Sequence, residues 1–251
     1  MAPGIGVDTQ ASRRDQIVAN ISSVRRRVAR ACAESGRDLS EITLVAVTKS
    51  RPASDVRLLA SLGLTDVGEN RDQEAAPKAH ACADLDLTWH FVGQLQTNKC
   101  RSVVSYADVV HSVDRPRLVD VLGREARRAG RRVVCFVQVR LDSAGDHGGV
   151  RSDDVRPLAD AVAATDGLAL AGVMAMAPQD ADPDEAFSRL AEVATKVRAD
   201  HREATMVSAG MSADMEQAIA HGATHLRIGT ALLGARAAGV RYGPTSGPAV
   251  P

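Results

Sequence analysis

The sequence predicts an α/β protein: a single closed (β/α)₈ barrel of the TIM type, with one extra helix at its N-terminal end. Short apolar segments, typical of strands buried on both faces, alternate with helical segments. Such strands must run parallel, because each return crossover requires a helix. Eight strand–helix units match a closed barrel. A doubly wound open sheet is the alternative, but its Gly-x-Gly-x-x-Gly fingerprint is absent after the first strand.

The extra helix is predicted over residues 11–35, and Gly36 is suited to end it. Apolar residues recur in this segment at steps of three and four, with arginines on the opposite face: Ile17, Ile21, Val24, Val28 and Ala31. Residues 1–10, ahead of the helix, are expected to form a flexible leader.

The remaining elements follow in order within one barrel domain, predicted over residues 11–240. The strand candidates are the apolar runs 42–48, 66–68, 88–92, 108–111, 133–139, 168–173, 205–208 and 225–228. The helical candidates lie between them, over 53–62, 71–82, 94–101, 115–129, 153–164, 183–200 and 212–221, with a last helix from Thr230. Residues 241–251 contain three prolines and two glycines and predict a disordered tail.

Composition excludes several classes of partner. Lysine plus arginine and aspartate plus glutamate both number 31, and aromatic residues make up 2% of the chain, so we expect no nucleic-acid binding. No apolar stretch approaches the roughly 20 residues that cross a bilayer, so we expect no membrane partner. The N-terminal residues lack the hydrophobic core of a secretion signal, and the four cysteines form no Cys-x-x-Cys pair. A reducing cytoplasmic location without a metal site is therefore predicted.

Lys49 directly follows the first apolar run, Ile-Thr-Leu-Val-Ala-Val-Thr at 42–48. In parallel α/β folds the carboxyl ends of the strands face the active site. A partly desolvated amine has a lowered pKa, which frees its lone pair to attack a carbonyl group. A carbonyl cofactor such as pyridoxal phosphate is a suitable partner, whereas an ordinary solvated lysine is the alternative.

Two segments after the last two strand candidates are suited to bind an anion. In the first, Ser208 ends a strand, Gly210 permits a tight turn, and Ser212 can cap the following helix. In the second, Gly229 leads to Thr230 at a helix start. Free backbone N–H groups at helix starts bind phosphate, and this is the usual phosphate position in such barrels.

Arg227 lies inside the last apolar strand, two residues before Gly229. A buried guanidinium needs an acceptor, because leaving it unpaired is costly. A ring nitrogen or a phosphate of a ligand would serve, and a salt bridge to a neighbouring carboxylate is the alternative.

Seven ordered motifs now resemble one family. They are LVAVTK at 44–49, GENRDQE at 68–74, WHFVGQLQTNK at 89–99, HSVD at 111–114, GVMAMAP at 172–178, SAGMSADMEQAI at 208–219 and HLRIGTALLG at 225–234. The chain resembles the pyridoxal phosphate homeostasis proteins, which are single-domain relatives of the barrel half of alanine racemase. The resemblance implies a PLP fold type III barrel without a C-terminal β-domain.

The resemblance also implies roles for individual residues. Lys49 matches the lysine that forms the internal aldimine (a Schiff base) with pyridoxal 5′-phosphate. Arg227 matches the arginine that faces the pyridine nitrogen and weakens the ring as an electron sink. The remaining cofactor-binding residues by this match are Asn70 in the pocket, Ser208, Gly210, Met211 and Ser212 in the first phosphate turn, and Gly229 and Thr230 in the second.

One segment departs from the family pattern, because Arg140 stands where an asparagine is common and His147 where a lysine is common. The resemblance implies PLP homeostasis, with transfer to PLP-dependent apoenzymes as a further role. The alternatives are an amino acid racemase and an aldolase-like barrel with Lys49 as the Schiff-base lysine. The racemase needs a second base, and neither Tyr106 nor Tyr242 falls at a convincing position for it. Without the β-domain that forms the racemase dimer, a monomer is expected.

Overall fold

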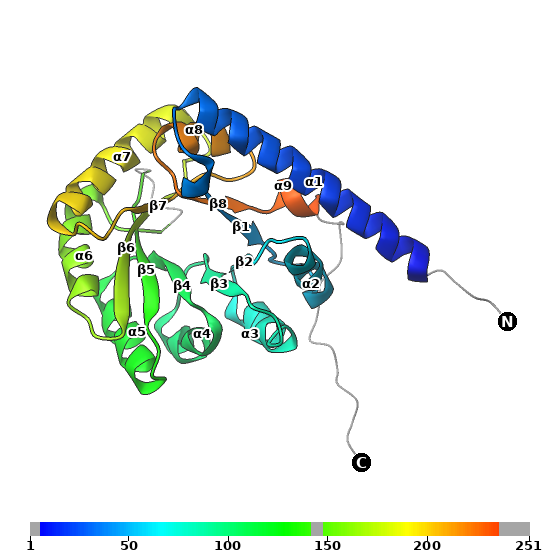
Figure 1. Cartoon of the computed structure of the whole chain (residues 1–251). Helices are drawn as coiled ribbons and strands as arrows, with labels where there is room; N and C mark the ends of the chain where they lie inside the picture. The colour runs from blue at the N-terminus through cyan, green and yellow to red at the C-terminus, as the bar shows by residue number, and fades with distance from the viewer. Residues whose placement is uncertain (1–5, 142–147, 236–251) are drawn as a thin grey trace, which may run out of the picture.

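A computed structural model describes residues 6–141 and 148–235, and these residues form a closed barrel of eight parallel strands in chain order (Figure 1). The strands are β1 (Thr43–Val47), β2 (Asp66–Glu69), β3 (Thr88–Phe91), β4 (Val109–Val113), β5 (Val133–Gln138), β6 (Leu168–Met174), β7 (Met206–Ser208) and β8 (His225–Ile228). All eight predicted strands are confirmed, with small differences at their ends. Because β1 pairs with both β2 and β8, the open-sheet alternative is excluded.

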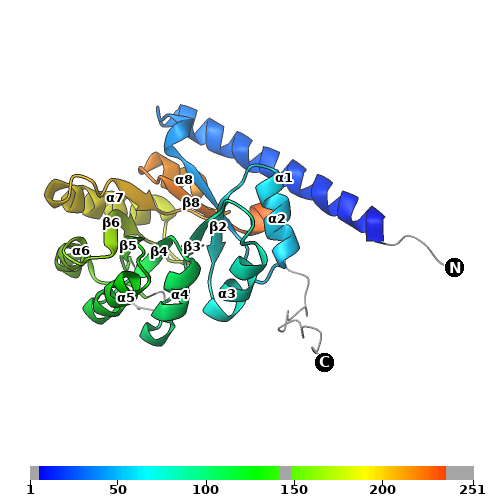
Figure 2. The same cartoon turned by 60° about the horizontal axis from the view of Figure 1, so that its bottom comes forward.

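Helices surround the barrel in the described part of the chain (Figures 1 and 2). The α-helices are α1 (Gly6–Glu34), α2 (Ala53–Ser61), α3 (Asp72–Ala81), α4 (Cys100–Tyr106), α5 (Pro116–Arg128), α6 (Val155–Ala163), α7 (Pro183–Asp200), α8 (Met215–Ala220) and α9 (Thr230–Leu233). The short 3₁₀ helices are η1 (Leu39–Glu41), η2 (Thr97–Lys99) and η3 (Ser152–Asp154). None of the helices described here combines the length and apolar character that a membrane span requires.

The largest differences from the expected helix boundaries are at the starts of two helices. Helix α1 begins at Gly6, so the leader predicted over 1–10 is helical from that residue, and residues 1–5 lie outside the described chain, as does the tail 241–251. The helix predicted over 94–101 starts later, as η2 followed by α4. Leu95 explains the delay, because its side chain is fully buried and its carbonyl oxygen accepts a hydrogen bond from Arg115 Nη2 at 2.7 Å. These contacts hold the segment as a loop.

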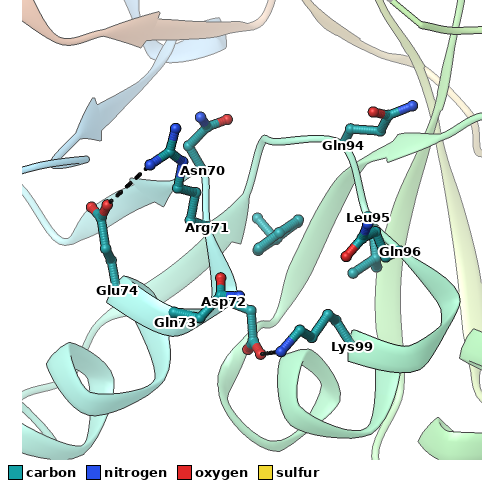
Figure 3. Close-up of a pocket in the computed structure, with 10 residues that line it drawn as sticks. Asn70, Arg71, Asp72, Gln73, Glu74, Gln94, Leu95, Gln96 and Lys99 are labelled. Carbon is teal, nitrogen blue, oxygen red and sulfur yellow. Dashed lines mark ion pairs between the residues drawn. The ribbon is translucent and has the colours of Figure 1, made fainter.

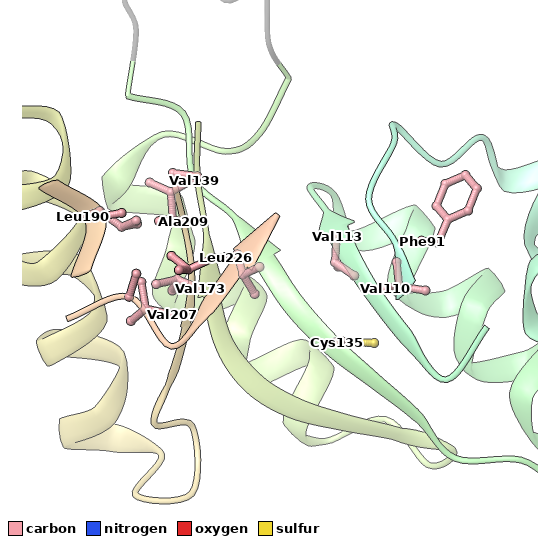
Figure 4. Close-up of a cluster of buried hydrophobic side chains, with 14 of the residues drawn as sticks. Phe91, Val110, Val113, Cys135, Val139, Val173, Leu190, Val207, Ala209 and Leu226 are labelled. Atoms are coloured by element: carbon pink, nitrogen blue, oxygen red, sulfur yellow. The ribbon is translucent and has the colours of Figure 1, made fainter. Parts of the chain in front are cut away.

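The main hydrophobic core lies between the strands and the surrounding helices. Figure 4 draws part of it, with Val173, Val207 and Leu226 from three neighbouring strands and Leu190 from α7. The β-branched, alternating strand residues supply this outward layer. The barrel wall is thus fixed on the outside by apolar packing, which leaves its inner face and its rims free to carry polar groups.

Helix α1 runs across the outside of the barrel beside α8 and α9 (Figures 1 and 2). Its buried stripe includes Ile17, Ile21 and Val24, as the helical period predicts. Asn20 Nδ2 donates a hydrogen bond of 2.8 Å to the carbonyl oxygen of Leu232 in α9. The extra helix therefore supports the two elements that follow β7 and β8.

Candidate functional site

The predicted site residues gather on one arc of the carboxyl rim. Lys49 follows β1, Asn70 follows β2, Ser208 ends β7, and Arg227 lies in β8. These four strands are consecutive neighbours in the closed barrel, in the order β7, β8, β1, β2. The barrel closure therefore brings together residues that are more than 150 positions apart in the sequence.

Lys49 continues the inward-facing series of β1. Val45 and Val47 line the interior, because a Cβ added at Gly68 would lie 3.1 Å and 3.2 Å from their methyl groups. Strand alternation places Lys49 on the same face, above Val47. The Lys49 side chain is exposed at this rim rather than desolvated by the protein.

Thr48, immediately before Lys49, is hydrogen-bonded to both members of a buried ion pair. Its hydroxyl donates to Glu69 Oε1 at 2.5 Å, and Lys78 Nζ donates to its carbonyl oxygen at 2.9 Å. Lys78 Nζ also lies 2.5 Å from Glu69 Oε1. Glu69 is completely buried, and burial raises the pKa of its carboxyl group even though Lys78 opposes that shift. Sequence reasoning missed this pair, although a glutamate inside the short strand β2 was a usable signal.

The residue after Lys49 is fixed as well. Ser50 adopts a left-handed conformation, with φ of 58°. Its backbone N–H donates to Glu74 Oε2 at 3.0 Å, so the amide of this turn has a hydrogen-bond partner. Both peptide neighbours of Lys49 are therefore anchored to β2 or α3, while the side chain itself remains accessible.

The turn after β7 depends on Gly210, which has φ of 87°. A Cβ there would lie 2.7 Å from the Ala218 Cβ atom, so only glycine fits without a shift. The backbone N–H of Met211 donates to Asp214 Oδ1 at 2.6 Å. That amide is therefore engaged within the turn, and Met211 contributes an exposed side chain instead.

Ser212 does not cap the helix that follows it, which corrects the sequence prediction. Helix α8 begins only at Met215, and Ser212 Oγ instead accepts a hydrogen bond of 3.1 Å from the backbone N–H of Ala231 in α9. Arg27 of α1 donates to the carbonyl oxygen of Ser212 at 3.1 Å. The turn after β7 is thus joined to the turn after β8, where Gly229 precedes Thr230 as expected.

Arg227 is 5% exposed, and burial lowers its pKa to about 10. Its Nη1 donates to Ser208 Oγ at 2.6 Å and its Nη2 to the carbonyl oxygen of Ala175 at 2.8 Å. Among residues 6–141 and 148–235, no carboxylate forms an ion pair with it. The salt-bridge alternative is therefore not found there, and Ser208 turns its hydroxyl toward Arg227.

A cavity of about 430 Å³ opens beside Asn70, at the carboxyl ends of β2 and β3 (Figure 3). Its lining includes the amides of Asn70 and Gln94 and the cations Arg71 and Lys99. Gly93 allows the backbone after β3 to approach the backbone of Asn70 closely, because a Cβ at Gly93 would lie 2.1 Å from the Asn70 carbonyl oxygen. Asn70 thus belongs both to the lining of this cavity and to the arc that carries Lys49.

Comparison with known proteins identifies the family of this barrel. Residues 13–237 match the family model described as "Alanine racemase, N-terminal domain", which defines the class of barrel. A Mycobacterium tuberculosis protein named pyridoxal phosphate homeostasis protein is 42% identical over 243 residues, covering 89% of this chain and 94% of the relative. An Escherichia coli K12 protein of the same name is 34% identical, covering 88% and 97%. The chain belongs to the pyridoxal phosphate homeostasis protein family.

Solved structures show the same relationship. PipY from Synechococcus elongatus with PLP bound has a TM-score of 0.73 and 33% identity, covering 83% of this chain and 100% of that chain. Its structure without PLP gives a TM-score of 0.75. An alanine racemase from Clostridium difficile, 11% identical with a TM-score of 0.67, shares the fold alone.

Proposed function

We propose that this chain binds pyridoxal 5′-phosphate at the arc β7–β8–β1–β2 and serves PLP homeostasis, the role for which its relatives are named. The observation that carries the proposal is the convergence of Lys49, Arg227 and the two joined turns on neighbouring strand ends. When bound, the cofactor supplies an aldehyde that condenses with a primary amine with loss of one water. The exposed amine of Lys49 is the proposed point of that attachment.

The donor set fits the other two groups of the cofactor. Gly229 has φ of −109°, which any residue can adopt, and a Cβ there would meet nothing closer than Val47 O at 3.5 Å. The missing side chain leaves room at the rim next to the α9 hydroxyl of Thr230, which suits a phosphate. Arg227 offers only N–H donors, so it pairs with an unprotonated ring nitrogen and favours holding the cofactor over strong carbanion chemistry.

The racemase alternative requires a second acid–base group at the rim. Tyr106, in α4, is partly buried and packs against Trp89 outside the barrel, at a ring-centroid distance of 6.3 Å. Tyr242 lies outside the described residues. The described rim therefore offers no tyrosine for that role, which supports the cofactor-holding function.

The decisive experiment is borohydride reduction of the protein with PLP, followed by peptide mass spectrometry. The expected result is a pyridoxyl phosphate mass on the Lys49 peptide, and Lys99→Ala, in the neighbouring cavity, serves as a control that retains it. A label on another lysine, or a colourless protein that gains no absorbance with PLP, would overturn the proposal. Incubation with single-enantiomer amino acids tests the racemase, because sustained loss of chirality would favour it.

The finer expectations belong to the same proposal. We infer a monomeric cytoplasmic protein that passes PLP to apoenzymes. The four cysteines are all free and buried, which suits a reducing compartment. Light scattering of the PLP-loaded protein tests the monomer, and mixing it with a PLP-free apoenzyme tests transfer through the recovery of that enzyme's activity.

A further inference from the structure

A continuous chain of hydrogen-bonded side chains crosses the barrel interior and ends on Arg227. Asp66 Oδ1 lies 3.0 Å from His90 Nε2, and His90 Nδ1 lies 2.9 Å from His111 Nε2. His111 Nδ1 lies 2.8 Å from Ser208 Oγ, which accepts the 2.6 Å bond from Arg227 Nη1. These residues come from β2, β3, β4, β7 and β8, so the chain spans the barrel rather than following its wall.

The two ends of this chain lie in different surroundings. Asp66 begins β2 at the amino rim, where its side chain is 29% exposed and lines a cavity of about 350 Å³. Arg227 lies toward the carboxyl rim, near the proposed cofactor site. Between them His111 is fully buried and stacks on Phe136 at a centroid distance of 4.6 Å and an interplanar angle of 23°. The interior part of the chain is thus held in a dry, packed environment.

The direction of the hydrogen bonds follows from the arginine end. A guanidinium only donates, so Ser208 Oγ accepts from Arg227. The buried hydroxyl must then donate its own hydrogen, and among the described residues its recorded acceptor is His111 Nδ1. His111 Nδ1 therefore carries no proton, and the proton of the neutral ring lies on Nε2, directed at His90. Burial lowers the pKa of His111 well below its usual value, which agrees with a neutral ring.

The carboxylate end is compatible with the same direction. An ionised Asp66 only accepts, so His90 carries a proton on Nε2. A neutral His90 then has an unprotonated Nδ1, which accepts from His111 Nε2. In the opposite polarity His90 is doubly protonated, both His111 and Arg227 donate to Ser208 Oγ, and the buried Ser208 hydrogen loses its acceptor. A buried hydroxyl hydrogen without an acceptor is unfavourable, so the direction from Arg227 to Asp66 is favoured.

We propose that Asp66, His90, His111 and Ser208 are positioning residues that form a one-directional relay and fix the orientation of Arg227. This inference rests on the proposed function, because Arg227 matters there as the donor that meets the cofactor ring. With Nη1 committed to Ser208 and Nη2 to Ala175 O, the guanidinium plane cannot rotate. An acid at the amino rim thereby influences how PLP is held at the carboxyl rim.

The first test reads the tautomers directly by ¹⁵N NMR of imidazole groups in the full chain, before and after loading with PLP. The expected spectrum shows His90 and His111 both as neutral rings with protons on Nε2. In the Ser208→Ala variant, the His111 signal is expected to move away from its position in the native protein. A proton on His111 Nδ1 would overturn the relay. The measurement without PLP keeps this inference separate, because it decides the tautomers even if the cofactor proposal fails.

The second test compares Asp66→Ala with Asp184→Ala, which breaks a chemically matched pair on the surface, where His221 Nε2 lies 2.9 Å from Asp184 Oδ1. Asp66→Ala is expected to shift the absorbance maximum of bound PLP and to move the His111 signal, whereas Asp184→Ala leaves both unchanged. Asp66→Asn keeps a carbonyl acceptor for His90 and should restore most of the native spectrum. A native PLP spectrum in a folded Asp66→Ala protein, or equal shifts in both alanine variants, would overturn the proposal.

Discussion

The ammonium group of Lys78 lies 2.9 Å from the carbonyl oxygen of Thr48, the residue that precedes Lys49. Lys78 is 7% exposed and its partner Glu69 is completely buried. Glu69 shares the outward face of β2 with Val67, so the pair lies behind the barrel wall. The charge that steadies the backbone beside Lys49 is therefore outside the proposed cofactor site, and it can be changed without touching that site.

Removing this charge should destabilise the protein. We expect Lys78→Met to lower the free energy of unfolding by about 3–5 kcal/mol, because it leaves Glu69 buried without its partner. The double variant Lys78→Met/Glu69→Met should recover most of the loss, and exposed Lys196→Met is the matched control. Urea denaturation measures all three. If Lys78→Met unfolded at the same urea concentration as the native protein, the ion pair would have no structural role.

The two glycines of the proposed phosphate turns should respond differently to alanine. Gly210→Ala places a Cβ 2.7 Å from Ala218 Cβ at a positive φ, so we expect a loss of about 1–3 kcal/mol in unfolding free energy. Gly229→Ala meets only ordinary contacts and should change stability by less than about 0.5 kcal/mol. Thermal denaturation distinguishes them, and equal losses would contradict this difference.

The fold could be predicted from the sequence because its signals are local. Each strand is a short apolar run, and α7 was found with its observed bounds at 183–200 because Pro183 and its helical period mark it. The rim positions of Lys49 and Arg227 follow from strand order alone. Contacts across the barrel could not be predicted in this way. Ser212 accepts a hydrogen bond from α9 rather than from the helix that follows it, and His90 contacts His111. Both contacts depend on how distant segments align in the folded barrel.

The bond between the two turns offers a third test. Ser212→Ala removes the acceptor of the Ala231 N–H, a cap-like interaction typically worth about 1 kcal/mol. If the turns hold the phosphate, the dissociation constant for PLP should rise by about fivefold, which corresponds to that free energy. Ser105→Ala, which removes an exposed bond to Ser102 O within α4, is the control. Fluorescence titration with PLP measures both, and equal affinities would argue against a role for the joined turns.

Replacing the proposed attachment lysine should separate covalent from non-covalent binding. Lys49→Ala removes an exposed side chain, so unfolding free energy should stay within about 0.5 kcal/mol of the native value. The variant should lose the borohydride-fixed mass yet retain weak PLP binding through the turns. Absorbance spectra and equilibrium dialysis check the two parts. A variant with the full native absorbance would show that another lysine holds the cofactor.

The interior histidines predict that stability falls in acid. Burial lowers the pKa of His225 to about 4 and that of His111 well below its usual value. Unfolded histidines titrate near pH 6.5, so below that pH the unfolded chain binds protons that the native barrel excludes. The free energy of unfolding should therefore be full above about pH 6.5 and fall by up to ~1.4 kcal/mol per pH unit for each of these rings. His225→Gln should make the unfolding free energy depend less steeply on pH between pH 6.5 and 4. At pH 8, the difference in unfolding free energy between the variant and the native protein reports the change in packing alone. Urea denaturation across that range measures the slope, and an unchanged slope in the variant would show that His225 is not buried in its neutral form.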